Sequence, residues 1–210
     1  MCNRLLAIIL LSFILTSGMN AKESGIKSGK PPIAKFIYGV EWGAGVSLCS
    51  YDRSTFITEE GYIVESRGYI SYTHINGIIN GFAGVSFLRR WQASLRCGYM
   101  GLRKGERAIP VSARLTYDLA DAPWNGSNLF VESGIALRHK GMDGFLAKAG
   151  YGYSFALTDG FSLALNCSAL FSISHPDVYD KYSGKIVDKE DLGMSKASNF
   201  GVLLTFEFCF

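Results

Sequence analysis

Few residues in this chain combine the type and the spacing that catalysis or metal binding requires. The three histidines are His74, His139 and His175, and no His/Cys group has the spacing of a zinc site. A nucleophilic or acid–base site needs a nucleophile, a base and an orienting group that converge. His139, and His175 with Asp177 nearby, are the candidates for such a group. We predict no catalytic residue, no enzyme activity, no metal site and no cofactor.

Charged residues occur singly within runs of small and polar residues. Six of them fall in the middle of alternating segments, and two more lie near segment ends, which gives four acids and four bases. This balance suits a closed interior, because a buried charge needs a partner. The predicted interior charge network consists of Glu41, Arg96, Arg114, Asp118, Glu132, Arg138, Lys148 and Glu207.

The elements that must position these charges are strands. Apolar residues alternate with polar or small ones, which is the period of a strand with two different faces. The clearest case is the C-terminal segment, where Phe200, Val202 and Leu204 lead into Phe206, Phe208 and Phe210 on one face. Eight such segments can be assigned, at about 36–51, 69–88, 91–102, 109–119, 128–138, 144–157, 161–174 and 199–210.

An even number of antiparallel strands is what an up-and-down bacterial barrel requires. The connections sort by length. The links at 88–90, 120–127 and 158–160 fall at one end, and two long polar loops, 52–68 and 175–196, fall at the other. We therefore predict an all-β fold, an eight-stranded antiparallel up-and-down transmembrane β-barrel over residues 36–210, with both termini at the short-turn end.

A soluble β-protein also alternates, but its apolar face points inward. Here the polar face carries the balanced charges, and the apolar face is aromatic near the strand ends, as with Trp42, Trp91 and Tyr117. Aromatic girdles of this kind mark the two interfaces of a membrane barrel. We predict that the apolar face contacts lipid and that the charge network fills the lumen, because eight strands leave room only for side chains or one small ligand.

The N-terminus has the layout of a secretory signal peptide. Arg4 precedes an apolar run from Leu5 to Leu15, which small and polar residues follow. We predict cleavage after Ala21, a signal peptide over residues 1–21 and a flexible lead-in over residues 22–35. The predicted location is the cell outer membrane.

Composition adds little about partners. The net charge is +3, and the basic residues are dispersed, so no nucleic-acid site is expected. Four cysteines follow the predicted cleavage site. We expect Cys97 and Cys167 to face lipid, and Cys49 and Cys209 to face inward at opposite ends of the barrel, beyond bridging distance.

Some local patterns resemble those of a known family. Asn80-Gly81-Phe82-Ala83-Gly84-Val85, then Leu95-Arg96-Cys97-Gly98-Tyr99 leading to Lys104-Gly105, and finally Ile109-Pro110-Val111, are similar to strands two to four of the outer-membrane β-barrel (porin-family) proteins of Bacteroidota. The resemblance implies that Phe210, with Phe208 and Phe206 in phase, is the signal read by the barrel-assembly machinery. It specifies architecture and no activity.

Three functions remain open from the sequence. The first is an envelope scaffold or surface-binding protein with a side-chain-filled lumen, whose extracellular ligand would bind loops 52–68 and 175–196, because function concentrates on loops held by a rigid scaffold. The second is a narrow porin-like channel for small solutes. The third, which we do not expect, is a lipid-modifying enzyme. The expected partners are outer-membrane lipid and the assembly machinery, and the expected state is a monomer.

Overall fold

The computed structural model of the chain describes residues 34–87, 90–103, 106–120, 125–138, 143–158, 160–181, 183–188 and 190–210. The predicted signal peptide, residues 1–21, and most of the predicted lead-in, 22–35, lie outside the described residues. Ala34 and Lys35 belong to the first strand. In the part of the chain that is described, no helix is long and apolar enough to cross a membrane.

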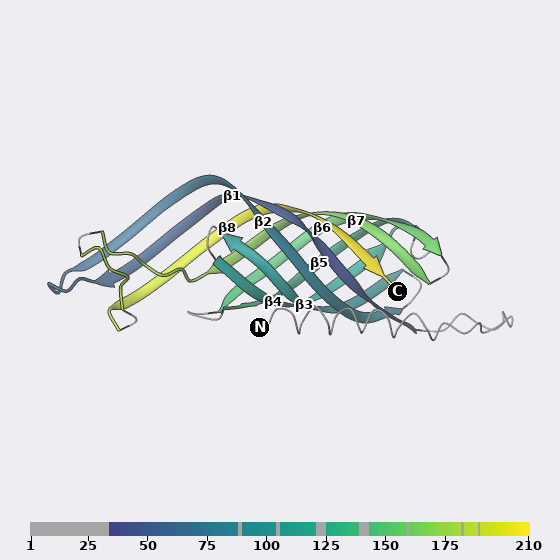
Figure 1. Ribbon diagram of the computed structural model, residues 1–210, viewed down its shortest axis with the longest axis horizontal. Coiled ribbons are helices and arrows are strands. Elements are labelled where there is room, and N and C mark those ends of the chain that lie inside the picture. Colours follow the sequence, from purple (N-terminus) through teal and green to yellow (C-terminus); the bar gives the residue numbers. More distant parts are fainter. Residues whose placement is uncertain are drawn as a thin grey trace, which may run out of the picture. The chain divides into compact units, whose positions relative to one another are not determined.

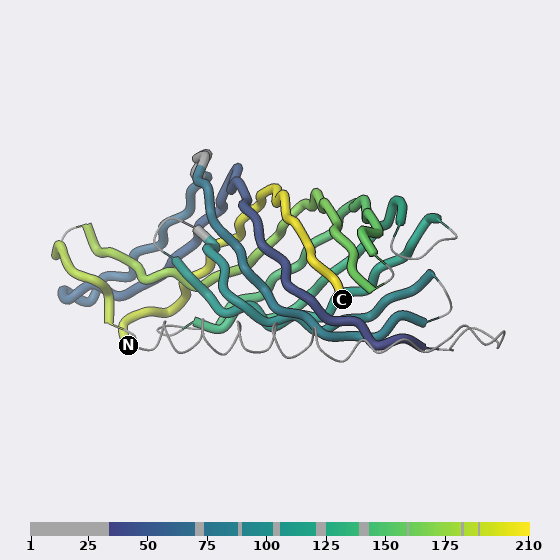
Figure 2. The backbone as a smooth tube through the Cα atoms, turned by 45° about the vertical axis from the view of Figure 1, so that its right-hand side comes forward, coloured from purple at the N-terminus to yellow at the C-terminus, as the bar shows by residue number. Residues whose placement is uncertain are grey.

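Eight antiparallel strands close into a barrel in chain order, with β1 paired to both β2 and β8 (Figures 1 and 2). This confirms the predicted all-β, eight-stranded, up-and-down barrel. The strands are β1 (Ala34–Ile57), β2 (Ile63–Phe87), β3 (Trp91–Arg103), β4 (Glu106–Asp118), β5 (Gly126–Leu137), β6 (Gly144–Thr158), β7 (Phe161–Ser174) and β8 (Leu192–Cys209).

The seam between β1 and β8 closes the ring. Tyr38 and Phe210 exchange backbone hydrogen bonds at the short-turn end, and Glu41 lies opposite Glu207 in the register. On the outer face, the Phe206 ring stacks on Trp42 with their centroids 5.6 Å apart. Phe208 stacks on Phe161 of β7. The three C-terminal phenylalanines thus belong to the closing seam, and their recognition by the assembly machinery stays a prediction.

The outer surface of the barrel is apolar. Large hydrophobic side chains point outward from every strand, such as Trp42 (51% exposed) on β1 and Leu95 (70% exposed) on β3. Aromatic pairs gather near the short-turn end, where Trp91 packs against Tyr117 and Tyr153 against Phe155. A soluble protein rarely exposes so large an apolar surface.

The interior holds an apolar cluster as well as charges. Its buried members are Ile78, Met100, Leu102, Ala108, Ala136, Leu146, Leu170 and Leu203. Leu170 and Leu203 stand on the otherwise polar face of β7 and β8. The alternation indicates which face a residue takes, but it does not show that part of the inner face is apolar.

Three strands continue far past the others at the end opposite the short turns (Figure 1). Tyr51 of β1 pairs with Tyr69 of β2 and with Ser198 of β8, and the pairing runs on to Ile57 opposite Ile63. We call residues 51–57, 63–69 and 192–198 the projecting sheet. The prediction of a long loop over 52–68 was therefore wrong, and that of a loop over 175–196 was too long. Charged and hydroxyl residues are interspersed with apolar ones here, and the apolar/polar alternation that marks a half-buried strand is lost.

A register shift lies between Ser47 and Cys49 of β1. Leu48 and Cys49 are both exposed, whereas Ser47 and Ser50 are buried. One extra residue therefore reverses the phase of the strand, as a β-bulge does. The expectation that Cys49 faces inward was wrong for this reason. Cys97 and Cys167 are exposed and Cys209 is buried, and all four are free thiols.

Candidate functional site

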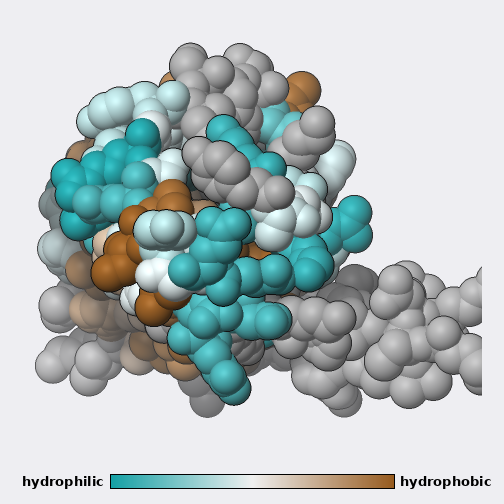
Figure 3. All heavy atoms as spheres, turned by 90° about the vertical axis from the view of Figure 1, so that its left-hand side faces the viewer, coloured by the Kyte–Doolittle hydropathy of each residue, from teal (hydrophilic) through white to brown (hydrophobic). Residues whose placement is uncertain are grey.

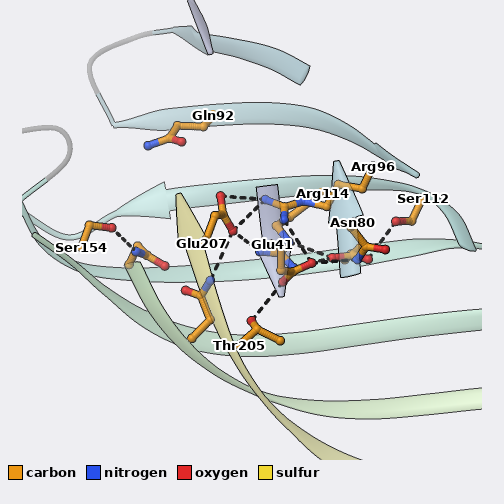
Figure 4. A network of polar contacts seen from close by, with 12 residues as sticks. Glu41, Asn80, Gln92, Arg96, Ser112, Arg114, Ser154, Thr205 and Glu207 are labelled. Atoms are coloured by element: carbon orange, nitrogen blue, oxygen red, sulfur yellow. Dashed lines mark hydrogen bonds and ion pairs between the residues drawn. The ribbon is translucent and has the colours of Figure 1, made fainter. Parts of the chain in front are cut away.

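Side chains from all eight strands meet in one polar cluster inside the barrel, and Figure 4 shows part of it. Its charged members are Glu41, Arg96, Arg114, Glu132, Lys148 and Glu207, three acids and three bases. Asn80 of β2 and Asn166 of β7 add hydrogen bonds from the remaining two strands. We call this set, with its hydrogen-bonding neighbours, the lumen network. Its fixed charges cancel, so it can occupy a closed interior.

Arg114 is the centre of the lumen network. Its Nη2 lies 2.7 Å from Glu41 Oε1 and 2.7 Å from Glu132 Oε2, and its Nη1 lies 2.9 Å from Glu207 Oε2. Its Nε also donates to Glu132 Oε2 at 2.8 Å. A guanidinium has five N–H donors in a planar fork, and Arg114 uses three of its nitrogens to join three carboxylates.

Arg96 and Lys148 complete the charge balance. Arg96 donates from Nη2 to both carboxylate oxygens of Glu207 at 3.0 Å, and its Nη1 lies 3.3 Å from Glu41 Oε2 without the alignment of a hydrogen bond. Lys148 Nζ donates to Glu132 Oε1 at 2.7 Å. Glu207 has the most exposed side chain of the six, at 14%.

Uncharged neighbours satisfy the remaining oxygens. Ser112 Oγ donates to Glu132 Oε1 at 2.8 Å, and Thr205 Oγ1 donates to Glu41 Oε1 at 3.0 Å. Asn80 Nδ2 donates to Glu41 Oε2 at 2.9 Å. Sequence reasoning did not single out these residues, although Ser112 and Thr205 stand on the polar face of their segments. Their phase relative to Arg114 and Glu207 was the available signal.

Two inward phenylalanines support the arginines. The Arg96 guanidinium lies 4.5 Å from the Phe82 ring centroid, and that of Arg114 lies 4.2 Å from the Phe130 centroid. These are cation–π distances. Both rings are buried. Their phase was again the available signal, because Phe130 lies two residues before Glu132 and Phe82 two residues after Asn80.

Two predicted members lie apart from the lumen network. Asp118 is buried at the short-turn end of β4, where it accepts a hydrogen bond from Gln92 Nε2 at 2.9 Å. Arg138 follows the last residue of β5 at the opposite end, where its guanidinium donates to the His175 carbonyl. Both were assigned by charge and phase, but their positions along the strands place them at opposite rims.

A small polar cavity lies beside the lumen network on the side of the short turns. Its volume is about 30 Å³, and its lining includes Gln92, Arg114, Asn166 and Glu207. A cavity of this size has room for about one water molecule. On the side away from the short turns, the apolar cluster around Met100 and Leu203 lies next to the lumen network. Ions would meet fixed ion pairs and then apolar side chains in this lumen.

The projecting sheet carries its own charge cluster. Glu65 accepts hydrogen bonds from Arg53 at 3.1 Å and from Arg67. These hydrogen bonds, first that of Arg67 and then that of Arg53, hold the pKa of Glu65 below its ordinary value. Glu59, in the β1–β2 turn, pairs with Lys185 at 2.8 Å, and this hydrogen bond raises the pKa of Lys185. The segment that precedes β8 is thereby tied to the hairpin tip.

The histidines do not assemble into a site among the described residues. His175 contacts the Ser195 carbonyl, which fixes the start of the segment before β8. His74 is half-buried on β2, and His139 lies outside the described residues. No group of three or more His, Cys, Asp or Glu residues in the described ranges could hold a metal ion.

Comparison with known proteins gives architecture and no family. No family model matches the chain, and no curated protein matches it. Among solved structures it is similar to Neisserial surface protein A (10% identity, 82% of this chain and 97% of that one, TM-score 0.33). It is also similar to the outer-membrane protease OmpT from Escherichia coli (9% identity, 90% of this chain and 99% of that one, TM-score 0.36). A third similar structure is a Pseudomonas aeruginosa FadL homologue (8% identity, 86% of this chain and 50% of that one, TM-score 0.31).

These likenesses carry no conclusion about activity, ligand or partner, and a Bacteroidota origin and a porin family stay predictions. One sequence-based expectation is corrected. The chain was predicted not to be an enzyme, yet OmpT is a protease among the outer-membrane proteins with which it can be compared. Proteins of this class therefore include enzymes, and the prediction does not stand.

Proposed function

We propose that the protein is a small outer-membrane β-barrel with a sealed lumen, which serves as a scaffold that presents the projecting sheet for binding at the cell surface. The observation that carries this proposal is the unequal length of the strands. β5 has 12 residues, whereas β1 and β2 have 24 and 25. A transmembrane strand needs about 9–11 residues, so β1 and β2 exceed that length more than twofold.

The surface of the barrel supports the membrane location. Its apolar side chains point outward and its charges point inward, which is the reverse of a soluble barrel. The ring also pairs neighbouring strands on both sides over most of the wall, which suits lipid, where each unsatisfied backbone group would cost several kcal/mol. The short turns then lie in the periplasm and the projecting sheet outside the cell.

The lumen network supports a scaffold over a channel. Arg114 and Arg96 connect carboxylates from β1, β5 and β8 across the interior. Breaking a buried pair of this kind leaves an uncompensated charge, which costs about 3–5 kcal/mol. Each solute that passed through the lumen would have to break these ion pairs. The narrow porin-like channel therefore has less support.

The projecting sheet supports a role in binding. Tyr62 and Ile63 at the hairpin tip are 68% and 75% exposed, and Tyr179 in the segment before β8 is 60% exposed. Figure 3 faces this end and shows hydrophobic side chains framed by hydrophilic ones. Exposed apolar residues with a polar rim are typical of interaction sites. The exposed side chains indicate a ligand that offers an apolar or aromatic surface.

A labelling experiment tests the placement of the two ends. Tyr62→Cys is made in a chain whose four native cysteines after residue 21 are replaced by alanine, and intact cells are treated with a membrane-impermeant maleimide. We expect Tyr62→Cys to react. Gly160→Cys, at an open position on the short-turn end, is the matched control and should react only in permeabilised cells. Labelling in the reverse pattern would contradict the proposed orientation, and recovery of the protein in the soluble periplasmic fraction would contradict the barrel's location.

A further inference from the structure

A lateral crevice interrupts the barrel wall between β2 and β3. The β2–β3 ladder begins only at Ile78 opposite Met100, although β2 continues its pairing with β1 as far as Ile63. Above this point, β3 and β4 form a short hairpin with a register shift between Gly101 and Arg103. Among the described residues, the β3-side edge of β2 is therefore unpaired at residues 74–77.

The crevice has a volume of about 510 Å³, within the range of small-molecule sites. Its two sides differ in chemistry. Ile75, Ile79 and Tyr99 line it from the outer, lipid-facing surface and are 70%, 50% and 45% exposed. Polar residues line it as well. His74, Asn76 and Glu106 stand in the inward phase of their strands, whereas Arg107, the residue after Glu106, is exposed in the outward phase.

Two observations indicate that the polar side is incomplete. The Glu106 Oε2 atom is buried and has no hydrogen-bond partner. The backbone of β2 at residues 74–77 also lacks a strand partner on this side. Buried carboxylate oxygens and backbone groups at a lipid boundary need partners. A neutral acyl chain alone could not supply them.

We propose that this crevice binds a zwitterionic aminophospholipid from the surrounding membrane. Its ammonium group would pair with Glu106 and its phosphate with Arg107, while an acyl chain would lie on Ile75, Ile79 and Tyr99. Glu106 on the inner side of the crevice and Arg107 on its outer side favour a headgroup that carries both charges. An anionic headgroup with no amine would leave Glu106 without a partner.

Native mass spectrometry of the full chain, released from vesicles that contain equal amounts of phosphatidylethanolamine and phosphatidylglycerol, tests the proposal. We expect one retained phosphatidylethanolamine, favoured about tenfold, which corresponds to about 1.4 kcal/mol. Glu106→Gln, which keeps the shape of the side chain, should abolish the preference. Equal retention of the two lipids by the natural chain would overturn the proposal.

Two glycines on the outer face of β2 provide a matched pair of variants. A Cβ at Gly77 meets nothing within 4 Å, and Gly77 lines the crevice, whereas Gly81 lies lower on the strand in a paired position opposite Cys97. Gly77→Trp should fill the crevice and remove the retained lipid, and Gly81→Trp should leave it. Equal loss in both variants would contradict a localised site.

Labelling of the natural chain keeps the proposal testable if a variant does not fold. A phosphatidylethanolamine with a photoreactive acyl chain is incorporated into the same vesicles and activated. We expect its adducts to concentrate on peptides that contain residues 74–79 and 99–107. Even labelling around the barrel exterior would overturn the proposal.

Discussion

At the scale of single residues, one guanidinium holds much of the interior together. Arg114 contacts carboxylates from three other strands, and the Phe130 ring packs against it. Because Glu41 and Glu132 are also buried, removal of the arginine would leave their charges undercompensated. The energetic role of Arg114 is thus larger than that of any ion pair on the projecting sheet, where water screens the charges.

We expect Arg114→Met to lower the free energy of unfolding by about 3–5 kcal/mol, the usual cost of breaking a buried ion pair. Urea unfolding of the barrel in detergent or lipid, followed by tryptophan fluorescence, measures the change. Lys196→Met, on the exposed face of the projecting sheet, is the matched control and should stay within about 0.5 kcal/mol. Equal stability of both variants would show that Arg114 is not central.

The sequence allowed the charged residues of the lumen network to be selected by phase, because Glu41, Arg96, Arg114, Glu132, Lys148 and Glu207 all stand on the polar face of an alternating segment. The level of each residue along the barrel could not be obtained in this way. Asp118 and Arg138 have the same phase and lie at the rims. Level depends on the register between strands, which a single sequence does not specify.

At the scale of the strands, close approach inside a small barrel requires missing side chains. A Cβ on Gly98 of β3 would lie 2.0 Å from the Ile79 carbonyl oxygen and 2.6 Å from the Asn80 Cα of β2. Both contacts are with backbone, which cannot move without shifting the ladder. The geometry therefore identifies Gly98 as a position that must stay without a side chain.

Gly98→Ala should therefore destabilise the barrel by at least 1 kcal/mol, in the range of overpacked sites. Gly81→Ala is the control on the partner strand, because its nearest neighbour would be the Cys97 carbonyl at 4.0 Å. The fraction that shows heat-modifiable gel migration after refolding reports the difference. A Gly98→Ala variant that folds as well as Gly81→Ala would show that the strands can separate at little cost.

The sequence predicts that each strand exists. It does not predict where a strand ends if that strand continues beyond the membrane. β3, β5, β6 and β7 match the predicted segments closely, since lipid on one side and the lumen on the other enforce alternation. β1, β2 and β8 continue beyond the level where the other strands end, and lipid and lumen no longer enforce alternation there. The bulge at Leu48 added a second error, because a one-residue insertion reverses every later side chain.

At the scale of the whole molecule, the barrel combines a closed interior with an enlarged surface at one end. The lumen network and the apolar cluster fill the interior. The projecting sheet is the continuation of β1, β2 and β8 beyond the barrel. A sealed barrel of this kind can anchor and present a surface without conducting solutes. The proposed lipid crevice lies in the wall and is compatible with a sealed lumen.

The central claim is that the lumen is sealed, and single-channel recording in planar bilayers tests it most directly. The natural chain, whose folding is first verified by heat-modifiable migration, is inserted and a voltage is applied. We predict a baseline without defined conductance steps. Reproducible steps, with an ion selectivity that changes in Glu207→Gln, would contradict the account and favour the narrow channel.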